Sequence, residues 1–381
     1  MPHRLAARRL IAWYGDDFTG STDVLEVLAT RGIESALFLS PPSDALRERF
    51  GGYRAFGLAG SSRSRSPEWM DANLPEAFRA LDRFETPLVH YKVCSTFDSA
   101  PETGNIGRAL EIGRNIFRAS CVPIVAGAPA LGRYTAFGNL FARSPEGIAR
   151  IDRHPMSRHP VTPMLEADLR LHLAKQTALR IGLIDLTSDT WTDGFDAMLI
   201  DVLDDRTLAR AGALAWNRAL QGDRFIVGSS GVEYSLAAHW GLRDDAVTTI
   251  RPADRLVVLS GSCSPVTGRQ IRAAAAAGFE LIPAGEDAAS QAICELKAGK
   301  SVVIHSAIGP EDQLPAGAAF REQLATLAGR TLTRVLDESD VRRGGGRRRH
   351  VIARRSRARN RRAHLRRPSR HGSSALPRMV Q

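Results

Sequence analysis

Two adjacent carboxylates, Asp16 and Asp17, stand where the first apolar segment of the chain gives way to hydroxyl side chains. The apolar run Leu10–Tyr14 predicts a β-strand, and the hydroxyls from Thr19 onward predict the start of a helix. Ligands of open α/β sheets bind beyond the carboxyl ends of the strands. Because one Asp is enough to cap a helix, the pair predicts a site for a polyhydroxylated substrate or a metal ion.

Basic side chains occupy the equivalent place after two further predicted strands. Arg63 follows strand Ala55–Ala59, and Lys92 ends another strand, with Ser95 and Thr96 behind it. An arginine can bind a carboxylate through two hydrogen bonds, although the Ser-rich loop around Arg63 is equally typical of a solvated turn. Since three strands deliver polar loops to one sheet edge, we expect these residues to bind a small anionic substrate.

A Gly- and Ser-rich turn that contains Gly261, Ser262 and Ser264 separates a later strand from a helix. Such a turn directs backbone N–H groups toward a phosphate at the positive end of the helix. It lacks the Gly-Lys-Ser/Thr ending of a Walker A motif. An ordinary tight turn is therefore an equal alternative to a phosphate site.

The segment 133–163 is rich in Arg, Gly, His and Pro and predicts long functional loops. His154 and His159 lie within it. Histidine is a common metal ligand, but the intervening prolines and arginines favour a loop that faces substrate. We therefore assign no metal ligands.

Short apolar runs alternate with helical patterns, which is typical of parallel sheets covered by helices. We expect an α/β protein of two domains, each a mostly parallel sheet flanked by helices, the second incomplete. The predicted boundaries are 1–242 and 252–341 for the domains and 342–381 for a disordered tail. The strands expected in the first domain are Leu10–Tyr14, Ser35–Leu39, Ala55–Ala59, Leu88–Lys92, Pro123–Ala126, Ile181–Ile184, Ala197–Val202 and Phe225–Val227. The second domain is expected to contain strands Leu256–Ser260, Phe279–Ile282 and Ser301–His305 and helices Val266–Ala277, Ala288–Ala298 and Phe320–Leu327.

Charge is distributed unevenly along the 381 residues. The chain has 52 Lys and Arg against 41 Asp and Glu, a net charge of +11. Fifteen arginines lie in 341–381, which holds no acidic residue, so residues 1–340 carry 37 basic and 41 acidic groups. A nucleic-acid function would rest on this tail alone, and the tail has no aromatic side chain for base stacking. We expect only incidental, salt-sensitive binding of nucleic acid.

The remaining bulk features indicate an intracellular protein. Its four cysteines have neither metal nor disulfide spacing, which is typical of reduced thiols in the cytoplasm. No apolar run approaches the ~20 residues of a membrane span. We therefore expect a cytoplasmic protein without a membrane partner.

The arginine-rich tail is consistent with a shifted reading frame that begins near Arg342 or Arg343. Permitted codons for residues 346–354, read one base later, encode Ala-Gly-Gly-Asp-Thr-Ser-Ser-His-Ala. The same shift allows an apolar strand before this turn and an amphipathic helix after it. A second glycine-rich turn, paired with the one at Ser262, would form a nucleotide cradle. The nucleotide sequence of codons 335–350 tests this hypothesis.

The ordered set of motifs resembles the four-carbon acid sugar kinase family. The matching segments are Tyr14–Gly20, Lys92–Ser99, Pro129–Arg133, His159–Thr162 and Ser260–Ser264, followed by Thr267 and Gln270. The likeness covers about residues 10–340. It implies an N-terminal domain for an acid sugar, a C-terminal domain for ATP, and ATP-dependent phosphorylation of a hydroxyl on a threonate-, erythronate- or 3-oxo-tetronate-like acid.

The resemblance also implies roles for single residues. The substrate carboxylate would be held by Arg63 and Lys92, and the attacking hydroxyl would give its proton to Asp17 or Asp16. Substrate binding is further implied for Ser95, Thr96 and Arg133, and ATP binding with Mg²⁺ for Gly261, Ser262 and Ser264. The family's Gly-Gly-Asp-Thr-Ser loop is missing from the translated chain, so we expect little or no kinase activity from this form. A homodimer is compatible with the resemblance.

The sequence also bears on two other functional classes. A non-catalytic acid-sugar-binding protein would share every N-terminal motif, and binding without ATP hydrolysis would identify it. A nicotinamide-dependent dehydrogenase is disfavoured because no Gly-x-Gly-x-x-Gly follows the first strand.

Overall fold

The computed structural model describes residues 9–159, 161–244, 253–262, 265–309, 312, 318–339, 341, 344–345 and 378–380. The chain divides into two compact units. One comprises Met1–Thr248 together with Ser373–Gln381, and the other comprises Thr249–Gly372. The α/β class expected from the sequence is confirmed in both units.

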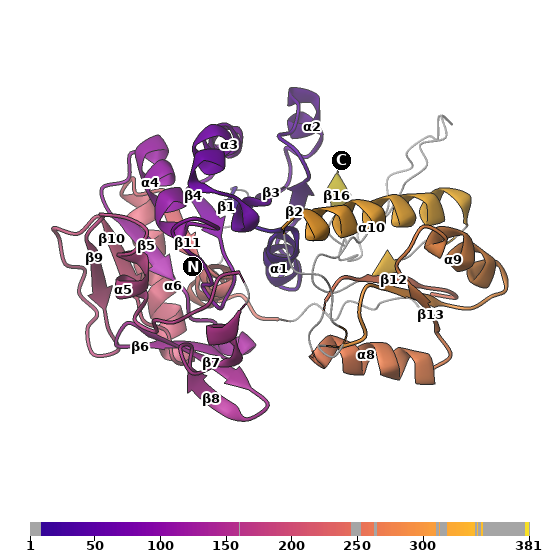
Figure 1. Cartoon of the computed structure of the whole chain (residues 1–381). Helices are drawn as coiled ribbons and strands as arrows, with labels where there is room; N and C mark the ends of the chain where they lie inside the picture. The colour runs from indigo at the N-terminus through magenta and orange to yellow at the C-terminus, as the bar shows by residue number, and fades with distance from the viewer. Residues whose placement is uncertain are drawn as a thin grey trace. The chain divides into compact units, whose positions relative to one another are not determined.

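A nine-stranded parallel sheet forms the centre of the first unit, in the order β16-β2-β3-β1-β4-β11-β5-β10-β9. The sheet twists between layers of helices (Figure 1). Its strands are β1 (Ile11–Gly15), β2 (Ser35–Phe38), β3 (Ala55–Ala59), β4 (Leu88–Lys92), β5 (Val122–Val125), β9 (Ile181–Ile184), β10 (Ala197–Ile200), β11 (Phe225–Gly228) and β16 (Arg378–Val380). All eight strands predicted for this part of the chain are present. Three have the predicted bounds, and the ends of the others differ by one or two residues.

Helices cover both faces of this sheet, so the strands are buried on both sides and are almost continuously apolar. The helices are α1 (Phe18–Ala29), α2 (Asp44–Arg49), α3 (Pro67–Asp82), α4 (Ile106–Phe117), α5 (Leu169–Leu173), α6 (Asp205–Leu220) and α7 (Gly231–His239). The connections include the 3₁₀ turns η2 (Ser62–Ser64), η3 (Pro129–Leu131) and η4 (Pro155–Arg158).

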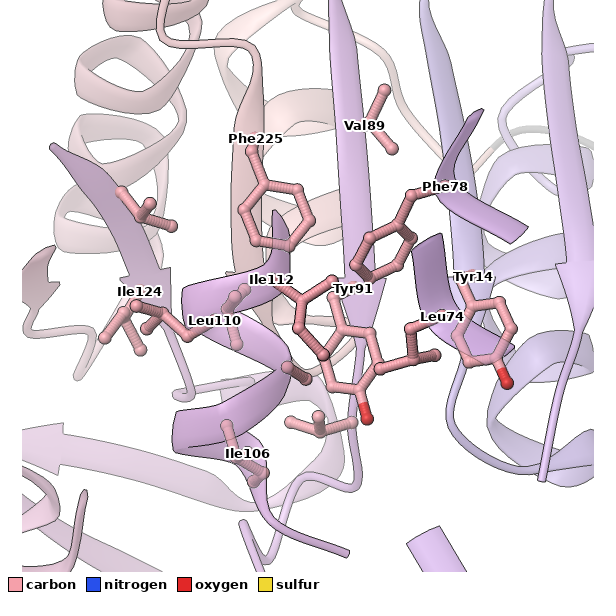
Figure 2. Close-up of a cluster of buried hydrophobic side chains, with 14 of the residues drawn as sticks. Tyr14, Leu74, Phe78, Val89, Tyr91, Ile106, Leu110, Ile112, Ile124 and Phe225 are labelled. Carbon is pink, nitrogen blue, oxygen red and sulfur yellow. The ribbon is translucent and has the colours of Figure 1, made fainter. Parts of the chain in front are cut away.

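The two faces of the sheet hold separate apolar cores. On one face, Phe78 of α3 and Leu110 of α4 pack with Tyr91 and Phe225 of the sheet, as Figure 2 shows. The opposite core holds Trp13 with side chains of α1, α6 and α7. Because side chains alternate along a strand, His90 and Lys92 of β4 point away from Tyr91, toward the face that α1 and α7 cover.

The segment from Arg133 to Pro163, predicted to be loops, contains a three-stranded antiparallel sheet, so that prediction was wrong. Its strands are β6 (Arg133–Ala136), β7 (Asn139–Ser144) and β8 (Gly147–Arg150). The turn between β6 and β7 has positive φ at Phe137 and Gly138, the geometry of a type I′ hairpin. The buried Asp201 carboxylate accepts a hydrogen bond from Gly138 N. The strands were missed because they are short and because Arg133 and Thr135 lie on the covered face, opposite Ala142 and Leu140, where the strand pattern calls for apolar side chains.

The second unit holds a four-stranded parallel sheet in the order β13-β14-β12-β15. Its strands are β12 (Val257–Ser260), β13 (Glu280–Pro283), β14 (Val302–His305) and β15 (Gly344–Gly345), and its helices are α8 (Pro265–Ala276), α9 (Ala288–Lys297) and α10 (Ala318–Glu338). Helix α10 is much longer than predicted. The apolar core of this unit contains Val257, Ile304, Leu296 and Val335.

Little of the arginine-rich tail lies among the described residues. Gly344–Gly345 pair with β12, and Arg378–Val380 pair with β2. The predicted disorder of 342–381 and the predicted domain limits remain predictions. In the described part of the chain, no helix combines the length and apolarity that crossing a bilayer requires.

Candidate functional site

The three polar loops predicted to share a sheet edge do leave the same edge. Gly15 of β1 lies in register with Ala59 of β3 on one side and with Lys92 of β4 on the other. Backbone hydrogen bonds then join the loops: Asp16 N donates to Lys92 O at 2.9 Å, and Arg63 N donates to Asp16 O at 3.0 Å. The parallel register therefore brings the side chains of three distant segments together.

Arg63 is held by both aspartates of the first loop. Its Nε and Nη2 donate to Asp16 Oδ2 at 2.9 Å and Oδ1 at 2.6 Å, a two-bond contact along one edge of the guanidinium. Its Nη1 donates to Asp17 Oδ2 at 2.9 Å. The sequence pattern left open whether Arg63 lies in a solvated loop, and the geometry places its guanidinium in this charged cluster.

Asp17 does two things at once. It is the N-cap of α1, where its Oδ1 accepts a hydrogen bond from Gly20 N at 2.6 Å. Its other oxygen binds Arg63. The Asp pair therefore combines two roles: Asp17 alone caps the helix, and both aspartates pair with Arg63.

Lys92 is buried and has a partner that sequence reasoning missed. Its Nζ donates to Val93 O at 2.9 Å and lies 3.3 Å from Asp23 Oδ2. The lysine side chain is 2% exposed and that of Asp23 is 30% exposed. A buried ammonium is costly without a counter-charge, and Asp23 lies one helical turn beyond Thr19, so helical spacing was the signal that could have identified it.

The two basic groups converge above Gly20. A Cβ at Gly20 would lie 3.1 Å from Lys92 Nζ, 3.6 Å from Arg63 Nη2 and 2.7 Å from Asp17 Oδ1. The absence of a side chain at Gly20 is therefore what leaves room for these charged atoms at the start of α1. The positive end of the helix dipole adds to their field.

Burial changes the acid–base properties of the cluster. It raises the pKa of Asp16 to about 6, although the guanidinium of Arg63 acts in the opposite direction. Burial alone would lower the pKa of Arg63, but Asp16 and its neighbours raise that pKa well above its usual value. Arg63 is therefore a permanent cation, and Asp16 is an anion that protonates in mildly acidic solution.

Aromatic side chains of the hydrophobic core support the loop that carries Arg63. Ser62 Oγ lies 2.9 Å from Tyr91 Oη, and both groups are buried. The Tyr91 ring stacks on that of Tyr14, with centroids 5.9 Å apart, and the edge of Phe78 meets both (Figure 2). A hydroxyl on a buried ring thus connects the hydrophobic core to the residue before Arg63.

Thr96 belongs to an adjoining polar network. Its Oγ1 donates to the buried Asp98 carboxylate, and Thr162 Oγ1 donates to the other oxygen of that carboxylate at 3.2 Å. Thr162 N in turn donates to His159 Nδ1 at 3.0 Å. Asp98 thereby ties the loop after β4 to the loop that carries His159, and sequence reasoning did not single it out.

Phe97 adds strain to that loop. It has φ +57° although it is bulky, and its ring is completely buried. The core thus holds the loop in a conformation that such a residue rarely adopts. Ser95 lies half-buried in the same turn.

Arg133 lies at the start of the β6–β7 hairpin, away from the three loops in the sequence. Its Nη1 donates to the carbonyl oxygens of Leu131, Gly132 and Arg143. His154 caps η4 by accepting from Met156 N. Among the described residues, no cluster of three or more His, Cys, Asp or Glu could hold a metal ion.

The predicted nucleotide turn begins at the end of β12. Gly261 is exposed, and Ser262 is buried and accepts from Thr267 Oγ1 at 3.1 Å, whereas Ser264 lies outside the described residues. Ser260 and His305 are register partners at the ends of β12 and β14. Within the described structure, the buried Ser260 Oγ and His305 Nδ1 have no hydrogen-bond partner.

Comparison with known proteins identifies the family. A family model described as "Sugar-binding N-terminal domain" matches residues 11–236. The chain is 46% identical over 355 residues to a 3-oxo-isoapionate kinase of Paraburkholderia graminis, covering 84% of this chain and 74% of that protein. It is 30% identical over 327 residues to a 3-oxo-tetronate kinase of Methylobacterium radiotolerans, covering 78% and 74% of the two chains.

A solved structure shares the fold. The crystal structure of Haemophilus influenzae protein HI1011 superimposes with a TM-score of 0.63 at 20% identity, covering 88% of this chain and 85% of that chain. The resemblance first suggested by short motifs is therefore confirmed along most of the sequence. This chain belongs to the family defined by the sugar-binding N-terminal domain, together with kinases of 3-oxo sugar acids.

Proposed function

We propose that this protein acts as an ATP-dependent kinase that phosphorylates a hydroxyl group of a four-carbon or similar acid sugar. The observation that carries the proposal is the convergence of Arg63, Lys92 and the Asp16–Asp17 pair at one sheet edge, in a chain 46% identical to a sugar-acid kinase. Cations and carboxylates in one cluster suit a substrate that carries both an acid group and hydroxyl groups.

The roles within the cluster follow from its chemistry. Arg63 and Lys92 attract and orient the substrate carboxylate, since both present N–H donors near Gly20. The aspartates accept hydrogen bonds from substrate hydroxyls, and one of them takes the proton of the attacking hydroxyl. Thr96, Ser95 and Arg133 are proposed to complete the substrate site.

ATP supplies the phosphoryl group, and a Mg²⁺ ion carried by its phosphates offsets their charge. The second unit fits a polar ligand of this kind, because Ser260 Oγ and His305 Nδ1 are buried without partners in the described structure. Gly261, Ser262 and Ser264 are proposed to bind the phosphates through the turn that begins α8.

We further propose that the arginine-rich tail arises from a shifted reading frame and that this form has impaired activity. The proposal rests on the alternate frame, in which permitted codons allow a second glycine-rich turn. The nucleotide sequence of codons 335–350 tests it, and a frame without that turn contradicts it. A chain with the restored frame is then expected to exceed this form in turnover.

The function is tested by following ADP release with ATP, Mg²⁺ and a panel of acid sugars that includes 3-oxo-isoapionate and 3-oxo-tetronate. Release that depends on one of these acids supports the proposal. Binding of an acid without ADP release, even after the frame is restored, would identify a non-catalytic acid-sugar-binding protein. A cytoplasmic location, where ATP is available, is part of the proposal.

A further inference from the structure

The two aspartates hold Arg63 in different ways. Asp16 uses both of its carboxylate oxygens, and its side chain is only 5% exposed. Asp17 uses a single oxygen, and its side chain is 30% exposed. A buried two-bond pair is held more firmly than a half-exposed single contact. Asp16 is therefore the fixed partner of Arg63, and Asp17 is the exchangeable one.

Both cations of the cluster already have carboxylate partners before any substrate arrives. Arg63 is paired with Asp16 and Asp17, and Lys92 is paired with Asp23. Three carboxylates thus face two cations. A further carboxylate entering this space must replace one of the three, because like charges in a partly buried site repel. The least expensive exchange is at Asp17, whose bond to Arg63 is single and accessible to solvent.

The geometry around Arg63 allows this exchange. Three of the five N–H donors of its guanidinium bind the two aspartates. Displacement of Asp17 would leave Asp16 bonded to Nε and Nη2, so the guanidinium would keep its orientation. The Nη1 group would then be open to an incoming carboxylate. Nη2 of the same guanidinium and Lys92 Nζ lie 3.6 and 3.1 Å from the Cβ position of Gly20, so such a carboxylate would also lie near Lys92.

We propose, on the basis of the function proposed above, that the substrate carboxylate displaces Asp17 from Arg63 and so releases Asp17 to act as the general base. After the exchange, Asp17 stays anchored at the start of α1 through the bond from Gly20 N to Oδ1. Its Oδ2 regains a free lone pair. The O–H bond of the substrate hydroxyl breaks, its proton moves to Asp17 Oδ2, and its electron pair stays on the oxygen that attacks the terminal phosphorus of ATP. The bond from that phosphorus to ADP breaks, and ADP leaves with its electrons.

This arrangement couples recognition to chemistry. A sugar acid both occupies Arg63 and frees the base, whereas a neutral polyol of the same length leaves Asp17 bound to Arg63. The cluster thereby distinguishes acids from neutral sugars in two ways. An acid binds more tightly to the cations, and only an acid releases Asp17 to act as the base. Asp17 is assigned as the catalytic residue and Asp16 as the positioning residue, which resolves the choice that the sequence left open.

The test measures binding, so it does not depend on turnover by this form of the chain. Calorimetric titrations of the full chain with erythronate, threonate and 3-oxo-isoapionate are compared with titrations of erythritol and threitol. Asp17→Asn removes the competitor for Arg63 but keeps a side chain that caps helices well. We expect this variant to bind an acid about three- to fivefold more tightly than the wild type, because the acid no longer has to break a half-exposed ion pair. The affinity for the polyols should not increase.

Two matched variants accompany this test. Asp16→Asn removes the fixed partner of Arg63, and we expect it to bind the acid about tenfold more weakly, because the guanidinium loses its two-bond support. Asp204 is also an N-cap aspartate, at α6, where it accepts from Thr207 N. Asp204→Asn is expected to leave both acid and polyol binding unchanged. Melting temperatures show whether each variant is folded.

A crystal structure with a bound acid separates exchange from a general effect of charge. We expect the ligand carboxylate within hydrogen-bond distance of Arg63 Nη1, and Asp17 Oδ2 beyond it. An intact Arg63–Asp17 bond in that complex, or an Asp17→Asn variant that binds the acid no more tightly than the wild type, overturns the exchange while leaving the proposed function standing. If neither the wild type nor Asp17→Asn binds any of the acids, both the exchange at Asp17 and the proposed function are overturned.

Discussion

The guanidinium of Arg63 lies edge-on against the carboxylate of Asp16, with Nε and Nη2 at 2.9 and 2.6 Å from its two oxygens. The two residues are 47 positions apart and are joined because β1 and β3 are parallel neighbours. The pair fixes the direction of the only basic group in the cluster that has N–H donors in a rigid plane.

Replacing Gly20 with Ala should impair acid binding without unfolding the protein. The new methyl group would lie 2.7 Å from Asp17 Oδ1 and close to Lys92 Nζ, in the space proposed for the substrate carboxylate. Alanine favours a helix over glycine by about 1 kcal/mol, and displacement of the Asp17 cap by the methyl group costs about as much, so the two effects on folding offset each other. We expect at least about tenfold weaker acid binding, a change of ~1.4 kcal/mol, with little change in melting temperature.

Gly329 of α10 provides the matched control for that substitution. Among the described residues, a Cβ at Gly329 would meet no atom within 4 Å outside the backbone of its own helix and its chain neighbours. Gly329→Ala is therefore expected to stabilise its helix and leave acid binding unaltered. Equal acid binding by Gly20→Ala and the wild type would show that the space above Gly20 is not the carboxylate seat.

Asp23→Ala should destabilise the protein more than Lys92→Met. The first change leaves a buried ammonium without its counter-charge, which costs about 1–3 kcal/mol when one partner of a buried pair is removed at a partly exposed site. The second replaces the lysine by an apolar chain of similar length and leaves Asp23 in contact with water. Urea unfolding of the two variants measures the difference, and the reverse order would contradict the role assigned to Asp23.

Acid binding should weaken below about pH 6. The pKa of Asp16 is raised to about 6 by burial, so this carboxylate is charged at neutral pH and becomes protonated as the pH falls through that value. A neutral Asp16 holds Arg63 less firmly, and the arginine then orients the substrate less well. Titrations between pH 5 and pH 8 should show this loss in the wild type, whereas Asp16→Asn should bind weakly at every pH in the range.

His172 should make the protein less stable in mild acid. Its Nε2 lies 2.8 Å from Ser99 Oγ and 3.0 Å from Gln176 Nε2, and burial lowers the pKa of this histidine to about 4. Between pH 6.5 and pH 4 the unfolded chain binds a proton on His172 that the folded chain does not bind. Stability is therefore lost as the pH falls through this window, by about 2 kcal/mol at pH 5.

The measurement compares the wild type with His172→Gln, whose amide oxygen can still accept hydrogen bonds from Ser99 and Gln176. The free energy of unfolding is determined by urea at pH 7.5 and pH 5. We expect the variant to lose about 2 kcal/mol less than the wild type between the two values. Equal losses would show that His172 takes up a proton in the folded state.

Much of the sheet could be predicted from the chain alone. Most strands of the large sheet are short apolar runs bounded by Gly and polar residues, because burial on both faces favours apolar side chains at most positions. Strands β6 to β8 were missed because their residues do not follow this rule. Arg133 and Thr135 lie on the covered face, opposite the buried Ala142 and Leu140, whereas the apolar Ile148 is exposed. Both features disrupt the alternation of apolar and polar residues that marks a half-buried strand.

The candidate site, too, could be predicted only in part. The sequence alone determined which residue types lie at one sheet edge, because the loops that follow parallel strands leave the sheet on the same side and the sequence shows Asp, Arg and Lys at those strand ends. Only the tertiary structure decided their partners: that Asp16 holds Arg63 with two bonds, that Asp17 caps α1 and that Asp23 balances Lys92. Such pairings depend on register, burial and side-chain direction across segments far apart in the chain, and no local pattern of residues encodes them.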